Sequence, residues 1–228
     1  MPMAESKPQA KFIVLDGCEG CGKSTQCELL AKALRKASHR VTRTFEPGVG
    51  KTGKKIRRLI FGPESEDLDS MTEMLLFLAD RRQHFLRVIW PALFRDRVVV
   101  CDRGWSATCA YQGFAGGVPL KEIEYLSKMA MRLRPLDRSC LPFVIVLDIS
   151  PKAGFGRKGG KGQDRMEQKQ SEYHERVGEG FRVFCREHPD STAKVDANGT
   201  IAEVHQAIIA VVNKKFEELE WNIRPVLC

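Results

Sequence analysis

Residues 17–24 (GCEGCGKS) constrain the fold of this chain more than any other segment, because they match the pattern GxxxxGK[ST] at every fixed position. The buried-strand pattern of residues 11–16 (KFIVLD) precedes them, and a helical pattern from residue 23 to about residue 37 follows. Glycines let successive backbone N–H groups turn inward around phosphate oxygens, and the following helix adds its positive N-terminus. A chance glycine-rich turn would lack these flanks, so we interpret the segment as a phosphate-binding loop (P-loop).

The P-loop predicts a nucleoside triphosphate and a magnesium ion as ligands but leaves the phosphate acceptor open. The Lys23 ammonium can reach the β- and γ-phosphates, and the Ser24 hydroxyl can ligate Mg²⁺. The candidate residues for binding the triphosphate are Gly17, Cys18, Glu19, Gly20, Cys21, Gly22, Lys23, Ser24 and Thr25.

Short apolar runs alternate with longer helical patterns along the chain. Residues 97–102 (RVVVCD) and 143–148 (FVIVLD) are nearly continuous hydrophobic runs that end in Asp, as expected of parallel strands buried on both faces. Weaker strand patterns cover 41–45 and 193–196, and apolar residues at helical spacing cover 71–89 and 201–219. Together they predict an α/β fold with a three-layer, doubly wound parallel sheet, whose ligand crevice lies at the carboxyl ends of the strands. We expect one domain over residues 11–220, with a mobile tail at 1–10 and a second tail at 221–228.

The chain has 228 residues and a formal net charge of +8, which favours a polyanionic partner. A nucleic acid is disfavoured because the sequence has no recognised nucleic-acid motif and no basic stripe interleaved with aromatic residues. A membrane is disfavoured because no stretch approaches the ~20 apolar residues of a transmembrane helix. The first ten residues (MPMAESKPQA) lack the apolar core of a secretory signal. We therefore expect a soluble, cytoplasmic protein.

Eight cysteines raise the question of zinc or disulfides. Only Cys18 and Cys21 are close in sequence, and no second CxxC or CxxH completes a four-ligand site. Reduced thiols in a reducing cytosol are favoured over zinc. A redox-sensitive P-loop is left open as the lesser alternative.

From Phe12 to about Ile208 the chain resembles the thymidylate (dTMP) kinase family. Five segments in the right order carry the resemblance: FIVLDGCEGCGKSTQ (12–26), FEPG (45–48), TEMLLFLADRRQH (72–84), VVVCDRGWSATCAYQG (98–113), and VLDISPKAGFGR with DRMEQ (146–157 and 164–168). The resemblance implies the fold of P-loop nucleoside monophosphate kinases. It implies transfer of phosphate from ATP to dTMP with Mg²⁺, small-molecule substrates, and a homodimer.

Several residues fit this chemistry on their own terms. Asp102 ends a buried strand and is placed to hold Mg²⁺, and Arg103 beside it offers a bidentate fork for an acceptor phosphate. Phe77 and Arg81 stand four residues apart on one helix face, and the resemblance makes them the residues that stack on and hydrogen-bond the base. It also places Glu19 near the sugar 3′-hydroxyl, Arg57 near the acceptor phosphate and Gln112 near the base. It further assigns Glu46 and Tyr111 to the substrate and Arg165 to the nucleotide.

Residues 152–161 (KAGFGRKGGK) contain four cations, no acid and four glycines, which predicts a flexible lid (LID, about 151–163) that closes over the phosphates. The P-loop has no arginine between Gly17 and Lys23, which resembles the bacterial-type branch of the family, where the LID supplies the catalytic cation. Arg157 and Lys161 are the candidates, and Lys161 falls on that branch's LID arginine. With them, Lys23 and Arg103 complete the predicted catalytic set.

The sequence departs from the family around the sugar and the acceptor phosphate. Gly104 replaces a ring (Tyr, His or Phe) that blocks a ribose 2′-hydroxyl, and Trp105 is the neighbouring ring that could take over this role. Further departures are Ala107 for Ser, Gly116 for Arg, and Val49 and Gly50 for the usual residues after Glu-Pro. Two alternatives therefore stay open: a kinase for another pyrimidine nucleoside monophosphate and, less favoured, a non-catalytic nucleotide-binding module.

Overall fold

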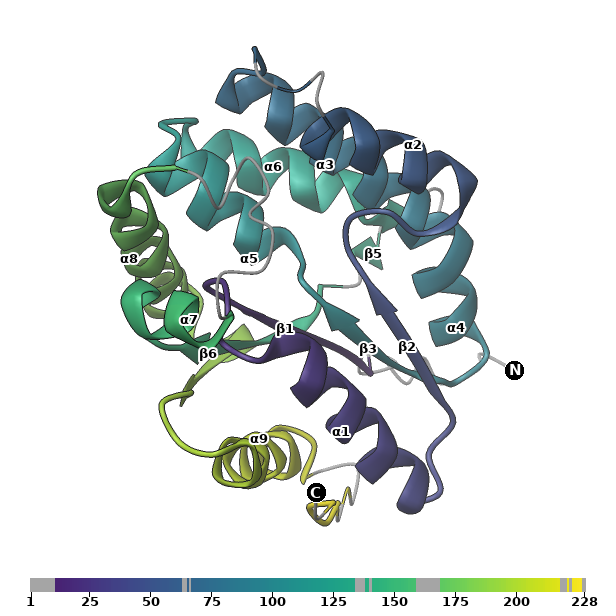
Figure 1. Cartoon of the computed structure of the whole chain (residues 1–228). Coiled ribbons are helices and arrows are strands. Elements are labelled where there is room, and N and C mark those ends of the chain that lie inside the picture. Colours follow the sequence, from purple (N-terminus) through teal and green to yellow (C-terminus); the bar gives the residue numbers. More distant parts are fainter. Residues whose placement is uncertain are drawn as a thin grey trace.

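The computed structural model describes residues 11–62, 65, 67–133, 138–139, 141–158, 169–217, 221 and 223–226. Its centre is a five-stranded parallel sheet with the order β2-β3-β1-β6-β7 (Figure 1). The strands are β1 (Phe12–Gly17), β2 (Val41–Phe45), β3 (Val98–Asp102), β6 (Phe143–Asp148) and β7 (Thr192–Asp196). A separate antiparallel pair joins β4 (Arg132–Leu133) and β5 (Arg138–Ser139). The predicted strands are confirmed to within a residue or two at their ends.

Alternating residues of the central strands face two separate cores. Ile13 and Leu15 of β1 pack with α1 (Lys23–Lys36) and α9 (Ile201–Lys215) on one face of the sheet. Phe12 and Val14 pack on the other face with α3 (Ser70–His84), α6 (Leu120–Ala130) and α8 (Ser171–Glu187). Figure 1 shows these two helical layers on either side of the sheet. Both faces are covered, which explains the near-continuous hydrophobic strands and confirms the predicted α/β class.

Most of the remaining helices are short. They are α2 (Gly50–Phe61), η2 (Phe85–Ile89), α4 (Trp90–Phe94), α5 (Trp105–Thr108), η3 (Cys109–Ala115), α7 (Pro151–Lys158) and η4 (Pro189–Ser191). The π-helical η2 comes just before Pro91, which has no N–H and whose ring would collide with the carbonyl of Arg87 in a regular α-helix. The apolar pattern of residues 71–89 is therefore helical throughout but changes its winding at residue 85.

Two expectations differ from what the structure describes. The first half of the predicted LID is the helix α7 rather than a loop, and residues 159–168 lie outside the described part of the chain. Trp221 and Ile223, assigned to a C-terminal tail, are buried: Trp221 stacks on Phe216 with ring centroids 4.3 Å apart, and Asn213 exchanges two hydrogen bonds with Ile223. Among the described residues, no helix has the length and apolarity needed to cross a membrane.

Candidate active site

The P-loop follows β1 and turns through three glycines with positive φ, Gly17 (140°), Gly20 (72°) and Gly22 (93°). Close packing is a second reason for glycine at position 17, because a Cβ there would lie 2.5 Å from the Leu147 carbonyl oxygen. The glycines of the motif thus allow both the turn and the approach of the loop to β6.

Lys23 is folded into the P-loop. Its ammonium donates to the carbonyl oxygens of Gly17 (3.0 Å) and Cys18 (2.8 Å), and its side chain is buried. Burial alone would lower the pKa of Lys23, but the neighbouring Cys21, Tyr111, Asp16 and Asp102 raise it overall. Lys23 therefore stays charged inside the predicted phosphate-binding loop.

Ser24 and Asp102 meet at the carboxyl end of the sheet. The Ser24 hydroxyl donates to Asp102 Oδ2 at 2.5 Å. Asp102 pairs in register with Leu15 of β1 and Phe45 of β2, so the sheet itself brings the end of β3 to the P-loop. The two predicted metal ligands are adjacent in the fold, and both offer the oxygen donors that Mg²⁺ prefers.

Arg103, Glu19 and Tyr111 form a second group on the acceptor side. Arg103 has a positive φ of 75° and pairs with the Glu19 carboxylate. Its guanidinium carbon lies 5.5 Å from the centre of the Tyr111 ring, and the Tyr111 hydroxyl is 3.5 Å from Glu19 Oε1. The P-loop acid and the predicted phosphate-binding arginine are therefore held as one unit.

Arg81 lies buried at the base of the pocket. Its Nε donates to Glu46 Oε2 (3.0 Å), and its Nη2 donates to the Gly104 carbonyl (3.0 Å) and the Thr108 hydroxyl (3.1 Å). Its Nη1 is buried and has no hydrogen-bond partner among the described residues. Burial alone would raise the pKa of Glu46, but attraction to Arg81 and the hydrogen bonds from His84 and Arg81 lower it. The pair is thus ionised, with one donor left over.

Aromatic and polar side chains line the pocket around Arg81. Phe77 is half-buried and packs edge-on against Phe61, with centroids 6.2 Å apart. Arg57 donates to the Pro47 carbonyl (3.0 Å) and stacks over Phe61. The Gln112 amide donates to Glu73 Oε2 at 3.2 Å.

Arg157 reaches across from α7 to the loop that follows β7. It donates to the carbonyl oxygens of Ala197 (2.8 Å), Asn198 (3.0 Å) and Gly199 (3.4 Å). In this structure its guanidinium therefore holds a loop at the rim of the site. The other LID candidate, Lys161, lies outside the described residues, as does Arg165.

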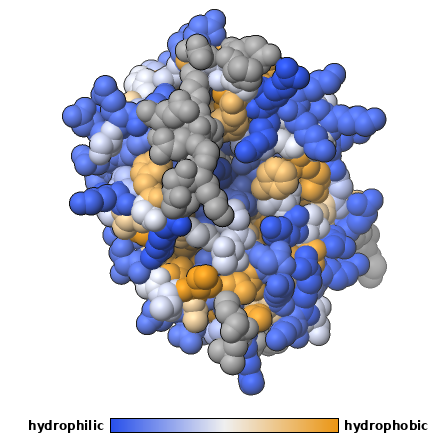
Figure 2. Space-filling view, in the orientation of Figure 1, coloured by the Kyte–Doolittle hydropathy of each residue, from blue (hydrophilic) through white to orange (hydrophobic). Residues whose placement is uncertain are grey.

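One cavity of about 640 Å³ joins these groups. The predicted residues that line it are Glu19, Gly20, Gly22, Lys23, Ser24, Thr25, Glu46, Arg57, Phe77, Arg81, Asp102, Arg103, Tyr111, Gln112 and Arg157. Gly17, Cys18 and Cys21 do not line it, and the two thiols are buried in the cores on opposite sides of the sheet. In the same orientation as Figure 1, the largely hydrophilic surface is hollowed near its centre, with apolar patches beside the hollow (Figure 2).

Sequence reasoning missed several residues that shape the site, among them Asp16 and Phe61. Asp16 is fully buried at the end of β1; its Oδ1 accepts from Gly17 N (3.1 Å), and its Oδ2 accepts from Gly104 N (3.2 Å), Ser106 Oγ (2.6 Å) and Ala107 N (3.0 Å). Asp16 thus joins the start of the P-loop to residues 104–107. Burial raises the pKa of its carboxyl group. An acid inside a hydrophobic strand was the available signal for Asp16, whereas nothing in the sequence marked Phe61.

Trp105 does not take the place of the ring missing at Gly104. It is buried against α8, edge-on to Phe184 with centroids 4.7 Å apart, and is not among the residues that line the cavity. Gly104 does line the cavity, and a Cβ there would lie 3.0 Å from a Val14 methyl carbon, directed at the core. The sugar side of the pocket therefore has no aromatic wall at either position.

A P-loop, a pair of Mg²⁺-type oxygen ligands and a second basic and aromatic pocket share one cavity at the carboxyl ends of a parallel sheet. This arrangement defines a nucleotide-binding phosphotransferase of the P-loop kinase class. A family model described as Thymidylate kinase matches residues 15–208. The chain belongs to the thymidylate kinase family, which confirms the predicted enzyme class.

Individual relatives agree with the family model. A thymidylate kinase of Symbiobacterium thermophilum is 37% identical over 204 residues, covering 89% of this chain and 92% of that protein. One of Gloeobacter violaceus is 37% identical over 216 residues, covering 92% and 99%. The crystal structure of thymidylate kinase from Ehrlichia chaffeensis superposes with a TM-score of 0.71 at 28% identity, covering 90% of this chain and 98% of that one. These matches confirm the predicted fold, a P-loop nucleoside monophosphate kinase.

Proposed function

We propose that this chain catalyses the transfer of the γ-phosphate of ATP to dTMP, giving ADP and dTDP, one step in making a pyrimidine deoxynucleoside triphosphate. The observation that carries the proposal is the single cavity in which the P-loop faces Arg81, Phe77 and Gln112. Phosphoryl transfer needs alignment and charge neutralisation rather than covalent help from the protein. The cavity supplies both, because donor-side and acceptor-side cations converge on the same space.

The acceptor nucleotide is held at both of its ends. Phe77 stacks on the base, and Arg81 Nη1 and Gln112 donate to its carbonyl groups. Arg103 and Arg57 bind the phosphate, and Glu19 approaches the sugar 3′-hydroxyl while it holds Arg103. Support comes from the ion pair of Arg103 with Glu19 and from the buried Nη1 that lacks a partner among the described residues.

Ser24 and Asp102 would hold the Mg²⁺ that accompanies ATP. The hydroxyl and carboxylate oxygens, 2.5 Å apart at the mouth of the P-loop, are the donor types that this ion takes. When bound, Mg²⁺ neutralises charge on the phosphates. Lys23 supplies a fixed cation on the same side.

The LID supplies the remaining cations, as in the bacterial-type branch of the family. Arg157 contacts the loop at 197–199 through three carbonyl oxygens. Lys161 and Arg165, which lie outside the described residues, are the further cations that we assign to the phosphates. Closure of this segment would exclude water from the transferring group. The LID thus adds cations to Lys23, because the P-loop has no arginine of its own.

A second acceptor has support from one feature. With glycine at position 104 and the Trp105 ring buried elsewhere, no aromatic side chain at either position meets a ribose 2′-hydroxyl. Another pyrimidine nucleoside monophosphate, UMP above all, is therefore the alternative acceptor.

The protein works as a cytoplasmic homodimer whose domain spans residues 11–220 and also includes the buried Trp221 and Ile223. Free thiols at every described cysteine fit a reducing compartment. Exposed apolar side chains of α2, α3, η2 and α4, namely Leu59, Met71, Leu75, Leu86 and Phe94, support the pairing of two copies.

A coupled assay of ADP release over a panel of ribo- and deoxynucleoside monophosphates tests the function. We expect turnover with dTMP above all others. Equal rates with dTMP and UMP would reject selection of deoxyribose, and no acceptor-stimulated ADP release would reject the kinase function altogether. Lys23→Ala is the matched inactive variant, because it removes the P-loop cation.

A further inference from the structure

His84 is a fully buried histidine beside the acceptor pocket that the proposed chemistry does not use. It ends α3, one helical turn beyond Arg81. Its Nε2 is 2.7 Å from the Thr44 hydroxyl and its Nδ1 is 3.0 Å from Glu46 Oε1. Both ring nitrogens are thus engaged with the end of β2 and the residue that follows it.

Glu46 connects His84 to Arg81. One carboxylate oxygen faces the imidazole, and the other accepts from Arg81 Nε at 3.0 Å. Arg81 Nη2 donates to the Gly104 carbonyl and the Thr108 hydroxyl, which are a second anchor for the guanidinium. The direction of the remaining donor, Nη1, is therefore fixed by two anchors, and one of them depends on how Glu46 is oriented.

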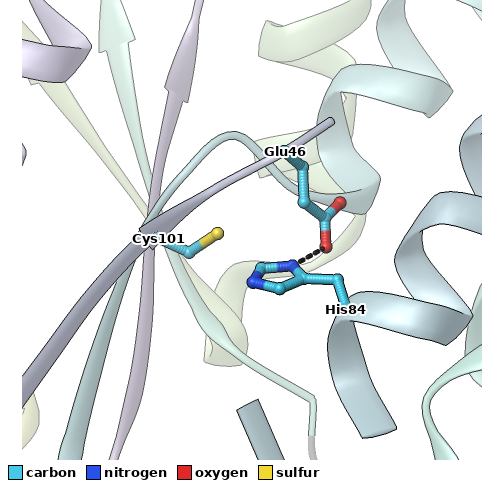
Figure 3. Close-up of side chains that lie close together, drawn as sticks. All are labelled: Glu46, His84 and Cys101. Atoms are coloured by element: carbon cyan, nitrogen blue, oxygen red, sulfur yellow. Dashed lines mark hydrogen bonds and ion pairs between the residues drawn. The ribbon is translucent and has the colours of Figure 1, made fainter. Parts of the chain in front are cut away.

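The same residues could be read as a metal site, because ligand atoms of Glu46, His84 and Cys101 all lie within 4.8 Å of one another (Figure 3). The contacts argue against that. The Arg81 guanidinium already neutralises the carboxylate, and Cys101 Sγ donates to the Arg103 carbonyl at 3.2 Å. Burial also raises the pKa of Cys101 well above its ordinary value, so the thiol keeps its proton instead of becoming a thiolate ligand. The cluster is better described as a hydrogen-bond chain.

We propose that His84 is a positioning residue for recognition of the acceptor base: it orients Glu46, which in turn orients the Arg81 guanidinium toward the base. The inference rests on the proposed function. Without the imidazole, one carboxylate oxygen of Glu46 loses its partner, and the carboxylate can rotate together with Arg81. Binding of the acceptor weakens, while the P-loop, which contacts none of these three residues among the described hydrogen bonds, keeps its affinity for ATP.

Two substitutions separate the contributions of the two ring nitrogens. His84→Asn places an amide nitrogen close to the position of Nδ1 and can keep the bond to Glu46, whereas His84→Gln reaches toward Thr44 and loses that bond. We expect His84→Gln to raise KM for dTMP by on the order of tenfold, because a hydrogen bond to a buried charge is lost. His84→Asn should stay within about threefold of the wild type by the same reasoning. KM for ATP should not change in either variant.

His205→Gln is the matched control. This histidine is also fully buried, but it lies in α9 on the opposite face of the sheet, and neither ring nitrogen has a hydrogen-bond partner among the described residues. It should leave KM for dTMP unchanged. Thr44→Val provides a second variant should His84→Gln fold poorly; because the bond to Glu46 remains, it should raise KM for dTMP by less than about threefold.

Equal effects of His84→Asn and His84→Gln on KM for dTMP, or a parallel rise in KM for ATP, would overturn the inference, as would a Thr44→Val effect as large as that of His84→Gln. The wild type distinguishes this from failure of the proposed function. A wild type without turnover on dTMP rejects the function itself, whereas an active wild type with indistinguishable variants rejects only the role of His84.

Discussion

The two P-loop cysteines show how burial controls the chemistry of a residue more than its place in a motif does. Cys18 and Cys21 lie in the phosphate-binding segment, yet they are 6% and 2% exposed. Burial raises the pKa of Cys18 to about 11 and also raises the pKa of Cys21. The positive charge of Lys23 lowers both pKa values, but by less than burial raises them. Since the thiolate is the reactive form, both thiols are poor nucleophiles. This disfavours the redox-sensitive P-loop that the sequence left open.

Alkylation of the native protein tests this assignment. We expect iodoacetamide at mildly alkaline pH to leave Cys18 and Cys21 unmodified while the half-buried Cys185 is alkylated, as read by peptide mass spectrometry. In denaturant all three should react alike. Labelling of Cys18 as fast as Cys185 in the native protein would contradict the prediction.

The buried pair of Glu46 and Arg81 makes stability depend on acid. Burial would raise the pKa of Glu46, but Arg81 and His84 bring it below the ordinary 4.5, so the folded state binds this proton more weakly than the unfolded state does. The resulting contribution to the free energy of unfolding is fully present above pH 4.5 and is lost as the pH falls through the folded pKa.

Glu46→Gln should therefore lower the melting temperature most at neutral pH. Leaving the Arg81 charge buried without its partner costs about 3–5 kcal/mol. The difference from the wild type should shrink as the pH falls below 4.5 and through the lowered pKa of Glu46, where Glu46 itself becomes neutral in the folded protein. Scanning fluorimetry of both proteins from neutral to acid pH measures this, and a pH-independent difference would argue against the ion pair.

At the scale of elements, α7 packs directly on the P-loop through two glycines. A Cβ on Gly20 would lie 1.9 Å from the Gly154 carbonyl oxygen, and one on Gly154 would lie 2.1 Å from the Glu19 carbonyl oxygen. Backbone therefore touches backbone where the LID begins. The position of α7 depends on the absence of a side chain at both residues.

Gly154→Ala should push α7 away from the P-loop and lower kcat/KM for ATP by roughly tenfold to a hundredfold, as small displacements in phosphate sites do. Gly156→Ala is the matched control in the same helix, because its Cβ would meet no atom within 4 Å. It should leave activity unchanged and stabilise the fold by about 0.5–1 kcal/mol. Steady-state kinetics and thermal melting of both variants decide the matter, and equal activity of the two would refute the contact.

Local pattern explains which elements could be predicted. The strands were predictable because β-branched runs such as FVIVLD need no partner to be recognised, and their Asp ends locate the crevice. The helix α7 was not, because two internal glycines weaken helix propensity and the packing against the P-loop outweighs it. Asp16, Phe61 and His84 act through contacts between elements far apart in sequence, which a local pattern does not encode.

At the scale of the molecule, the helix α3 lies between the site and the surface. Phe77, Arg81 and His84 face the acceptor pocket or its supports, whereas Met71 and Leu75 are 39% and 51% exposed. Exposed apolar side chains continue into α4, where Phe94 is 77% exposed. Large apolar side chains grouped on neighbouring helices are typical of a surface that another protein covers. The proposed occupant is a second copy of this chain.

The oligomeric state provides the test. We expect the wild type to run as a dimer in size-exclusion chromatography with light scattering, and Leu75→Glu to shift it to monomer, because a carboxylate in an apolar interface loses its hydration. Ile201→Glu is the matched control. The exposed fraction of Ile201 (53%) is similar to that of Leu75 (51%), but Ile201 lies at the start of α9 on the opposite face of the sheet. It should remain dimeric. A monomeric wild type, or loss of the dimer in both variants, would reject the α3 interface. Since α3 also carries Phe77 and Arg81, a monomeric Leu75→Glu should further show a raised KM for dTMP if pairing fixes the position of this helix.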